Sequence, residues 1–76
     1  MTKTLLDLQQ GEEVTIKGLN PDIEVDLRRY LLGMGLVKGA KIKKEKIAPL
    51  GDPIKFKLKD YLICLRKEEA KQIEVE

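Results

Sequence analysis

The ten residues 47–56, IAPLGDPIKF, decide the fold of this chain, because they place two prolines and a glycine between two apolar runs. Pro49 fixes its own φ, and Gly51 can adopt the positive φ of a tight turn. Asp52 can accept hydrogen bonds from nearby backbone amides, and Pro53 suits the first position of a strand. We therefore predict a stiff connector between two long strands. Such a loop either binds a partner with little loss of entropy or serves only to stabilise a hairpin.

The strand pattern continues on both sides of this connector. Residues 54–59, IKFKLK, alternate apolar side chains with lysines, which is typical of a half-buried strand. Residues 62–66, LICLR, are apolar on both sides and predict a central strand, in which Cys64 is an inert interior residue. Ile42 and Ile47 differ by an odd number of positions, so they can share a face only if a bulge separates them.

Residues 20–36, NPDIEVDLRRYLLGMGL, contain the only long helix that the sequence predicts. We expect Asn20 to cap it and Pro21 to take its first position. One apolar stripe faces the core, and it consists of Ile23, Leu27, Tyr30, Leu31 and Met34. Val25 and Leu32 lie on the opposite side of the helix. Either the leucine-rich amino terminus covers these two residues, which we expect, or a partner does.

The length indicates one small domain over residues 1–76. The strand patterns and their spacing predict a mainly β fold with one helix and about five strands in a compact barrel. A net charge of +2 does not by itself indicate nucleic acid. One cysteine cannot form an internal disulfide, and neither a membrane span nor a signal peptide is visible in the sequence. We therefore predict a cytoplasmic protein.

The residue types exclude several kinds of catalytic and metal site. With no histidine and one cysteine, neither a zinc-type site nor a Cys-His nucleophile can form. The acidic clusters show no ligand set of fixed geometry, and they are Glu12, Glu13, Asp22, Glu24, Asp26, Glu68 and Glu69. The glycine-rich run GMGLVKG lacks the spacing of a P-loop. We therefore predict no catalytic residue, no cofactor and no metal site, and an enzyme is the least favoured class.

Lysines crowd the two strands that flank the connector, and they are Lys41, Lys43, Lys44, Lys46, Lys55, Lys57 and Lys59. Such a basic face can bind nucleic acid, but the few aromatic residues argue against base stacking. Lysines on strands also prevent edge-to-edge aggregation, which is the simpler interpretation. An acidic protein surface or anionic lipid headgroups would suit them too if a partner lies in a membrane.

Three segments in order resemble the FeoA family of bacterial ferrous-iron uptake: 31–42, LLGMGLVKGAKI; 48–58, APLGDPIKFKL; and 65–76, LRKEEAKQIEVE. The resemblance implies an SH3-like β-barrel without catalytic activity. It also implies action on the cytoplasmic side with FeoB, an iron transporter that combines a membrane permease with a GTPase domain. The barrel would contact the membrane only through this partner, and self-association stays possible.

The leading functional hypothesis is a binding module that docks on the transporter and modulates it. The candidate partner surface joins the end of the helix to the connector, and it consists of Arg28, Arg29, Leu32, Met34, Leu50, Gly51 and Asp52. The alternative is a freestanding SH3-like regulatory domain related to metal-dependent repressors. Such a domain would bind a divalent metal or a DNA-binding partner.

Overall fold

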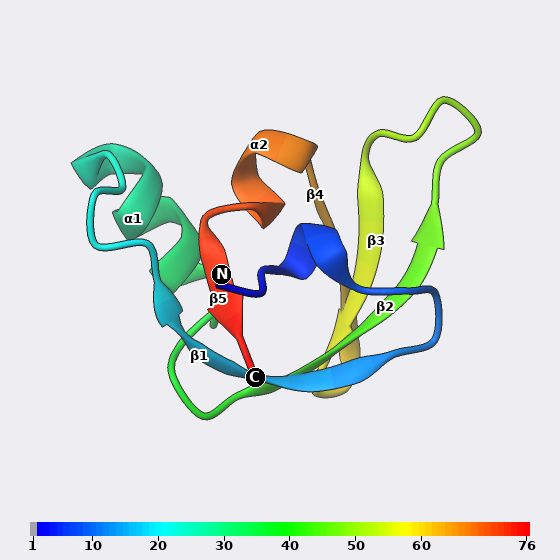
Figure 1. Cartoon of the computed structure of the whole chain (residues 1–76), viewed down its shortest axis with the longest axis horizontal. Helices are drawn as coiled ribbons and strands as arrows, with labels where there is room; N and C mark the ends of the chain where they lie inside the picture. The colour runs from blue at the N-terminus through cyan, green and yellow to red at the C-terminus, as the bar shows by residue number, and fades with distance from the viewer. Residues whose placement is uncertain (1) are drawn as a thin grey trace.

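A computed structural model describes residues 2–76, and it shows five strands, one principal helix and two short helical turns (Figure 1). In chain order the elements are η1 (Leu5–Asp7), β1 (Glu13–Leu19), α1 (Val25–Gly33), β2 (Lys41–Ile47), β3 (Ile54–Leu58), β4 (Tyr61–Leu65), α2 (Lys67–Ala70) and β5 (Ile73–Val75). The prediction of a mainly β domain with one principal helix is confirmed.

The strands form one antiparallel sheet in the order β4-β3-β2-β1-β5. The sheet coils around the core, but no strand pairing joins β4 to β5 within the described residues, so it is not strictly closed. The prediction that β4 is central is wrong, because β4 pairs only with β3 and ends the sheet. Its outward residues Leu62 and Cys64 are exposed, so Cys64 is not an interior residue.

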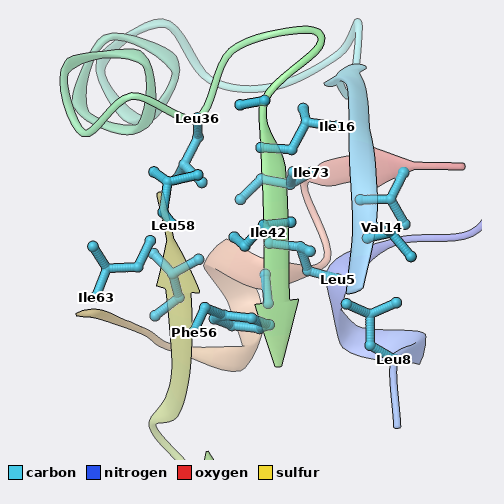
Figure 2. Packing of buried hydrophobic residues seen from close by; sticks show 14 of the residues in the cluster. Leu5, Leu8, Val14, Ile16, Leu36, Ile42, Phe56, Leu58, Ile63 and Ile73 are labelled. Carbon is cyan, nitrogen blue, oxygen red and sulfur yellow. The ribbon is translucent and has the colours of Figure 1, made fainter. Parts of the chain in front are cut away.

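The core lies on the concave side of the sheet, where alternate residues of each strand meet (Figure 2). Ile54, Phe56 and Leu58 point inward from β3 as predicted. Leu5 and Leu8 reach the same core from the amino-terminal segment. Burial of one such side chain stabilises the fold by roughly 1.5–3 kcal/mol.

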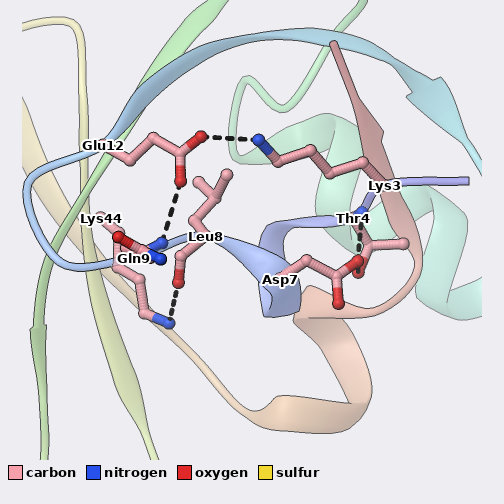
Figure 3. Close-up of polar contacts among 7 residues, drawn as sticks. All are labelled: Lys3, Thr4, Asp7, Leu8, Gln9, Glu12 and Lys44. Atoms are coloured by element: carbon pink, nitrogen blue, oxygen red, sulfur yellow. Dashed lines mark hydrogen bonds and ion pairs between the residues drawn. The ribbon is translucent and has the colours of Figure 1, made fainter.

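The register between β2 and β3 shifts between Lys44 and Lys46, which confirms the predicted bulge. Ahead of the bulge, Lys44 lies on the same side as Ile42 and is only 4% exposed. Its Nζ donates a hydrogen bond to the Leu8 carbonyl oxygen at 2.6 Å (Figure 3). Lys44 therefore does not belong to the basic face, and it fastens the amino-terminal segment to the central strand.

The start of α1 corrects the sequence-based prediction. The helix begins at Val25, and the Glu24 carboxylate caps it by accepting from the amides of residues 26 and 27. Asn20 instead holds a turn, since its side-chain oxygen accepts from the Asp22 amide. The Asn20 side chain also donates to Gln72, which lies far along the chain. This long-range bond fixes Asn20 before the helix begins.

The faces of α1 differ from the prediction at two residues. Ile23, Leu27 and Met34 pack against the core, but Tyr30 is 53% exposed. Val25 is 60% exposed, so the amino-terminal segment does not cover it. That segment packs against α2 and β5 instead, because its leucines fill the open side of the sheet.

Candidate functional site

A groove of about 620 Å³ runs along the outer side of α1. Its apolar lining comes from the end of β1, the turn before the helix, the helix itself and the segment after it. The apolar residues are Leu19, Ile23, Val25, Leu32 and Leu36, and Pro21 also lines the groove. Two cationic residues, Arg28 and Lys38, complete it. The groove is therefore an apolar depression with positive charge beside it.

Local sequence signals shape both ends of this groove. The extended conformation of Glu24 (φ −64°, ψ 139°) lets the chain turn before the helix, which leaves Val25 in solvent. At the other end, the amides of Gly35 and Leu36 donate to the carbonyls of Leu32 and Leu31 at 3.0 and 3.3 Å. This pattern is a Schellman cap, and it requires the positive φ of 93° at Gly35. The cap places Leu36 in the core and against the groove.

The helix end is also tied to the sheet by a side chain. The Tyr61 hydroxyl donates a hydrogen bond of 2.8 Å to the Met34 carbonyl oxygen. A Cβ atom at Gly35 would lie 2.9 Å from the same hydroxyl oxygen, so a side chain there would force the Tyr61 hydroxyl to move. The groove wall therefore depends on the contact between α1 and the start of β4.

The cationic residues of the groove are available to a partner. Within residues 2–76, neither Arg28 nor Lys38 lies within ion-pair distance of a carboxylate. Arg28 is exposed on the helix, and so is its neighbour Arg29, which does not line the groove. A carboxylate presented at the groove would thus meet an unpaired guanidinium or ammonium group.

Three hydrogen bonds hold the connector between β2 and β3. The Gly51 amide donates to the Ala48 carbonyl oxygen at 2.7 Å, and the Ala48 amide donates to the Pro53 carbonyl oxygen at 3.1 Å. The Asp52 carboxylate accepts from the Lys67 amide at 3.0 Å, at the start of α2. These bonds leave Leu50 at the tip of the connector, where it is 94% exposed.

The structure does not bring the two halves of the candidate partner surface together. Met34 lies beside Tyr61, at one end of the β3–β4 hairpin. The connector enters β3 at Ile54, which is the other end of that hairpin. Figure 1 shows α1 and the connector at opposite ends of the molecule. The seven candidates therefore form a helix patch and a separate connector patch.

Sequence reasoning identified Arg28 and Leu32 but missed the rest of the groove. The sequence predicts that the amino terminus covers Val25, although its position off the apolar stripe was the signal that could have found the groove. Leu19, Leu36 and Lys38 come from other segments, and only the tertiary fold brings them to the helix.

The described residues contain no cluster of the side chains that most often bind metal ions. In this part of the chain, no three His, Cys, Asp or Glu side chains gather closely enough to hold an ion. A search of residues 2–76 for a helix with the length and apolar character of a membrane span also finds none.

Comparison with known proteins identifies the family. A model of the FeoA domain matches residues 3–76. A Campylobacter jejuni protein named as a candidate Fe(2+) transport protein A is 35% identical over 72 residues, which are 95% of each chain. A fusion of Fe(2+) transport protein A with the Fe(2+) transporter FeoB, from Porphyromonas gingivalis, is 45% identical over 49 residues. That match spans 64% of this chain and only 6% of the fusion protein.

Solved structures agree with this assignment. A FeoA-like protein from Clostridium acetobutylicum has a TM-score of 0.85 and 41% identity, covering all of this chain and 88% of that one. Stenotrophomonas maltophilia FeoA, described as an SH3 domain protein complexed with zinc, has a TM-score of 0.85 and 25% identity, covering 97% and 89%. A manganese-dependent transcriptional repressor shares the fold at a TM-score of 0.88 but only 16% identity, covering 99% and 36%.

The fold is thus that of a small SH3-like domain, as the resemblance implied. The chain belongs to the FeoA family, whose named members here are proteins of ferrous-iron transport.

Proposed function

We propose that this protein is a non-catalytic cytoplasmic accessory of ferrous-iron uptake that docks on a FeoB-type transporter and modulates it. The groove along α1 is the docking site in this proposal. The observation that carries it is the combination of an apolar lining with the unpaired cations Arg28 and Lys38. The fusion of a relative with FeoB supports the choice of partner, because domains joined in one chain work in the same complex.

The groove specifies the chemistry of the segment that it would accept. Its apolar lining favours one or two aliphatic or aromatic side chains, since burial of apolar surface drives association. Arg28 and Lys38 favour a carboxylate beside those side chains, and paired charges at the rim give specificity and a faster encounter. The expected ligand is therefore an acidic, partly apolar segment on the cytoplasmic side of the transporter.

A pair of neighbouring arginines provides a matched test of this site. Arg28→Glu places a negative charge at the groove, whereas Arg29→Glu makes the same change of charge outside it. We expect Arg28→Glu to abolish co-purification with the detergent-solubilised transporter and Arg29→Glu to preserve it. Equal losses would show that only net charge matters, and no loss with Arg28→Glu would overturn the docking site.

A second pair tests the apolar lining. Leu32→Glu would leave a carboxylate among apolar groups of the partner, and such desolvation weakens binding by at least about a hundredfold. Tyr30→Glu changes an exposed residue of the same helix that does not line the groove. Far-UV circular dichroism of each variant checks the fold. A pull-down against the separate cytoplasmic domains of the transporter would then identify the segment that is bound.

The alternative of a metal-sensing regulatory domain rests on the shared fold alone. It requires a cation site, so calorimetric titration with ferrous or manganous ion without oxygen tests it directly. We expect no binding heat at high micromolar metal. A saturable heat would favour the regulatory alternative over the accessory function.

A further inference from the structure

Six exposed or half-exposed lysines gather on the convex side of the sheet, five on β2 and β3 and one in the turn after β3, and they are Lys41, Lys43, Lys46, Lys55, Lys57 and Lys59. Lys43 and Lys57 are direct partners across β2 and β3, and Lys46 and Lys55 are the next pair past the bulge. Side chains of directly paired residues lie side by side on one face. The lysines therefore form a continuous basic face, defined here by these six residues.

Little negative charge compensates the basic face. Lys43 Nζ lies 3.8 Å from the Glu45 carboxylate, and within residues 2–76 it is the only one of the six lysines with an ion pair. Glu13 lies opposite Lys43 across β1 and β2 and lines a hollow together with four of the lysines. Clustered like charges repel one another, so the face favours a surface that carries many anionic groups.

Apolar side chains border the basic face along the strand that ends the sheet. Leu62 lies opposite Lys57 and Cys64 lies opposite Lys55, and both are exposed on the same side as those lysines. Leu62 thus places an apolar side chain beside the basic face. The arrangement combines cations with apolar groups, as surfaces that bind the membrane interface do.

The connector extends this mixed surface to the end of the hairpin. A hollow of about 390 Å³ is lined by Lys46 and Lys55 of the basic face and by apolar residues of the connector and its flanks. These apolar residues are Ile47, Ala48, Pro49 and Pro53. Leu50 stands beyond them at the tip. The basic face and the exposed leucine are therefore continuous.

We propose that the convex face of β2, β3 and β4 is a peripheral binding surface for anionic phospholipid membranes. The six lysines lie over the phosphate-bearing headgroups, and Leu50 inserts at the boundary between headgroups and acyl chains. The stiffness of the connector reduces the entropy lost when Leu50 is held there. The surface is separate from the groove on α1, so this inference does not depend on the proposed docking.

The observations favour lipid over single-stranded nucleic acid as the occupant. Binding of single strands relies on aromatic side chains on which bases stack. Phe56 is buried, and the hydroxyl of Tyr61 is bound to the Met34 carbonyl at the far end of the hairpin. Aliphatic side chains border the lysines instead, and these suit an acyl environment rather than a base.

Vesicle co-sedimentation tests the proposal with the isolated protein. Phosphatidylcholine vesicles are compared with phosphatidylcholine–phosphatidylglycerol vesicles at low and high salt. We expect binding only to the anionic vesicles, with a loss at high salt because the attraction is screened. Each basic residue at the surface contributes about a fivefold factor in partitioning. Equal binding to both kinds of vesicle, or no binding to either, would overturn the proposal.

Matched double variants separate the basic face from net charge. Lys43→Glu with Lys57→Glu reverses two charges on the face, and we expect partitioning to fall at least about 25-fold. Arg29→Glu with Lys71→Glu makes the same change of net charge at exposed positions elsewhere and should retain most of the binding. Equal losses in the two variants would refute the assignment of the surface.

The tip of the connector gives an uncharged test. Leu50→Ser removes the side chain that inserts, and we expect roughly a tenfold weaker partitioning, from the value of one buried leucine. The fold should not change, since Leu50 touches water on nearly all sides. Unchanged partitioning would exclude insertion. A single-stranded oligonucleotide bound more tightly than anionic vesicles would replace lipid with nucleic acid as the ligand.

Discussion

Replacement of Gly35 by alanine tests how the end of α1 is built. Gly35 has a φ of 93°, and its amide and the next one close the Schellman cap. A side chain in this left-handed region costs about 1–2 kcal/mol. The new Cβ would also lie 2.9 Å from the Tyr61 hydroxyl oxygen, which must then move away from the Met34 carbonyl. Loss of that hydrogen bond adds about 0.5–1.5 kcal/mol.

The expected destabilisation is therefore about 2–3 kcal/mol, within a total stability of about 4–11 kcal/mol for a domain of this length. Urea unfolding followed by far-UV circular dichroism measures it, and the melting temperature should fall by about 10–20 °C. Gly33→Ala is the matched control. Gly33 is helical, and nothing lies within 4 Å of an added Cβ there. We expect this control to be neutral or stabilising by up to about 1 kcal/mol.

A double-mutant cycle separates the two parts of the effect. Tyr61→Phe removes the hydroxyl with which the new methyl group would collide. Gly35→Ala should thus cost less in the Tyr61→Phe background, with a coupling of about 0.5–1.5 kcal/mol. If the losses of stability of the two single variants add up in the double variant, only the backbone conformation of residue 35 causes the effect of Gly35→Ala. A Gly35→Ala protein as stable as the parent would refute the reasoning altogether.

Three further predictions concern stability. Phe56→Ala empties the centre of the core and should destabilise the protein by about 3–5 kcal/mol, as measured by urea unfolding. Asp52→Ala removes the acceptor for the Lys67 amide and should cost about 0.5–2 kcal/mol in thermal unfolding, whereas Asp52→Asn should cost less. The hydrogen bond from Lys3 lowers the pKa of Glu12. The contribution of the ionised Glu12 to folding stability is therefore present above the unfolded pKa of that carboxyl and is lost as the pH falls through the folded pKa. Glu12→Gln should therefore reduce the loss of stability at acid pH. The same loss in the variant and the parent protein would contradict this.

The strands beside the connector could be predicted because burial alternates along them. The alternation of β3 appears directly in the sequence, and the odd spacing of Ile42 and Ile47 required the bulge that the structure contains. The same parity placed Lys44 on the side of Ile42, although lysines are rarely buried. The charge of Lys44 assigned it to the basic face, whereas the two-residue alternation of the strand placed it inside. The alternation was correct.

Long-range contacts account for what the sequence did not predict. Asn20 carries the signal of a helix cap, but its bond to Gln72 commits it to another role. The apolar outer side of β4 looked like a central strand, because a sequence does not show whether an apolar face meets protein or water. A sequence also does not show how far apart two loops lie in space, and the helix end and the connector were therefore predicted to be adjacent. Their separation follows from the pairing of β3 with β4.

The amino-terminal segment joins the two ends of the chain in space. The Lys3 carbonyl accepts from the Val75 amide, and Thr4 forms a bridge with Glu74, so the amino-terminal segment lies beside β5 (Figure 1). Lys3 and Thr4 thus acquire these partners only after β5 has been synthesised. Until then Leu5 lacks its final position, and the domain completes its fold only after synthesis of the whole segment to Val75.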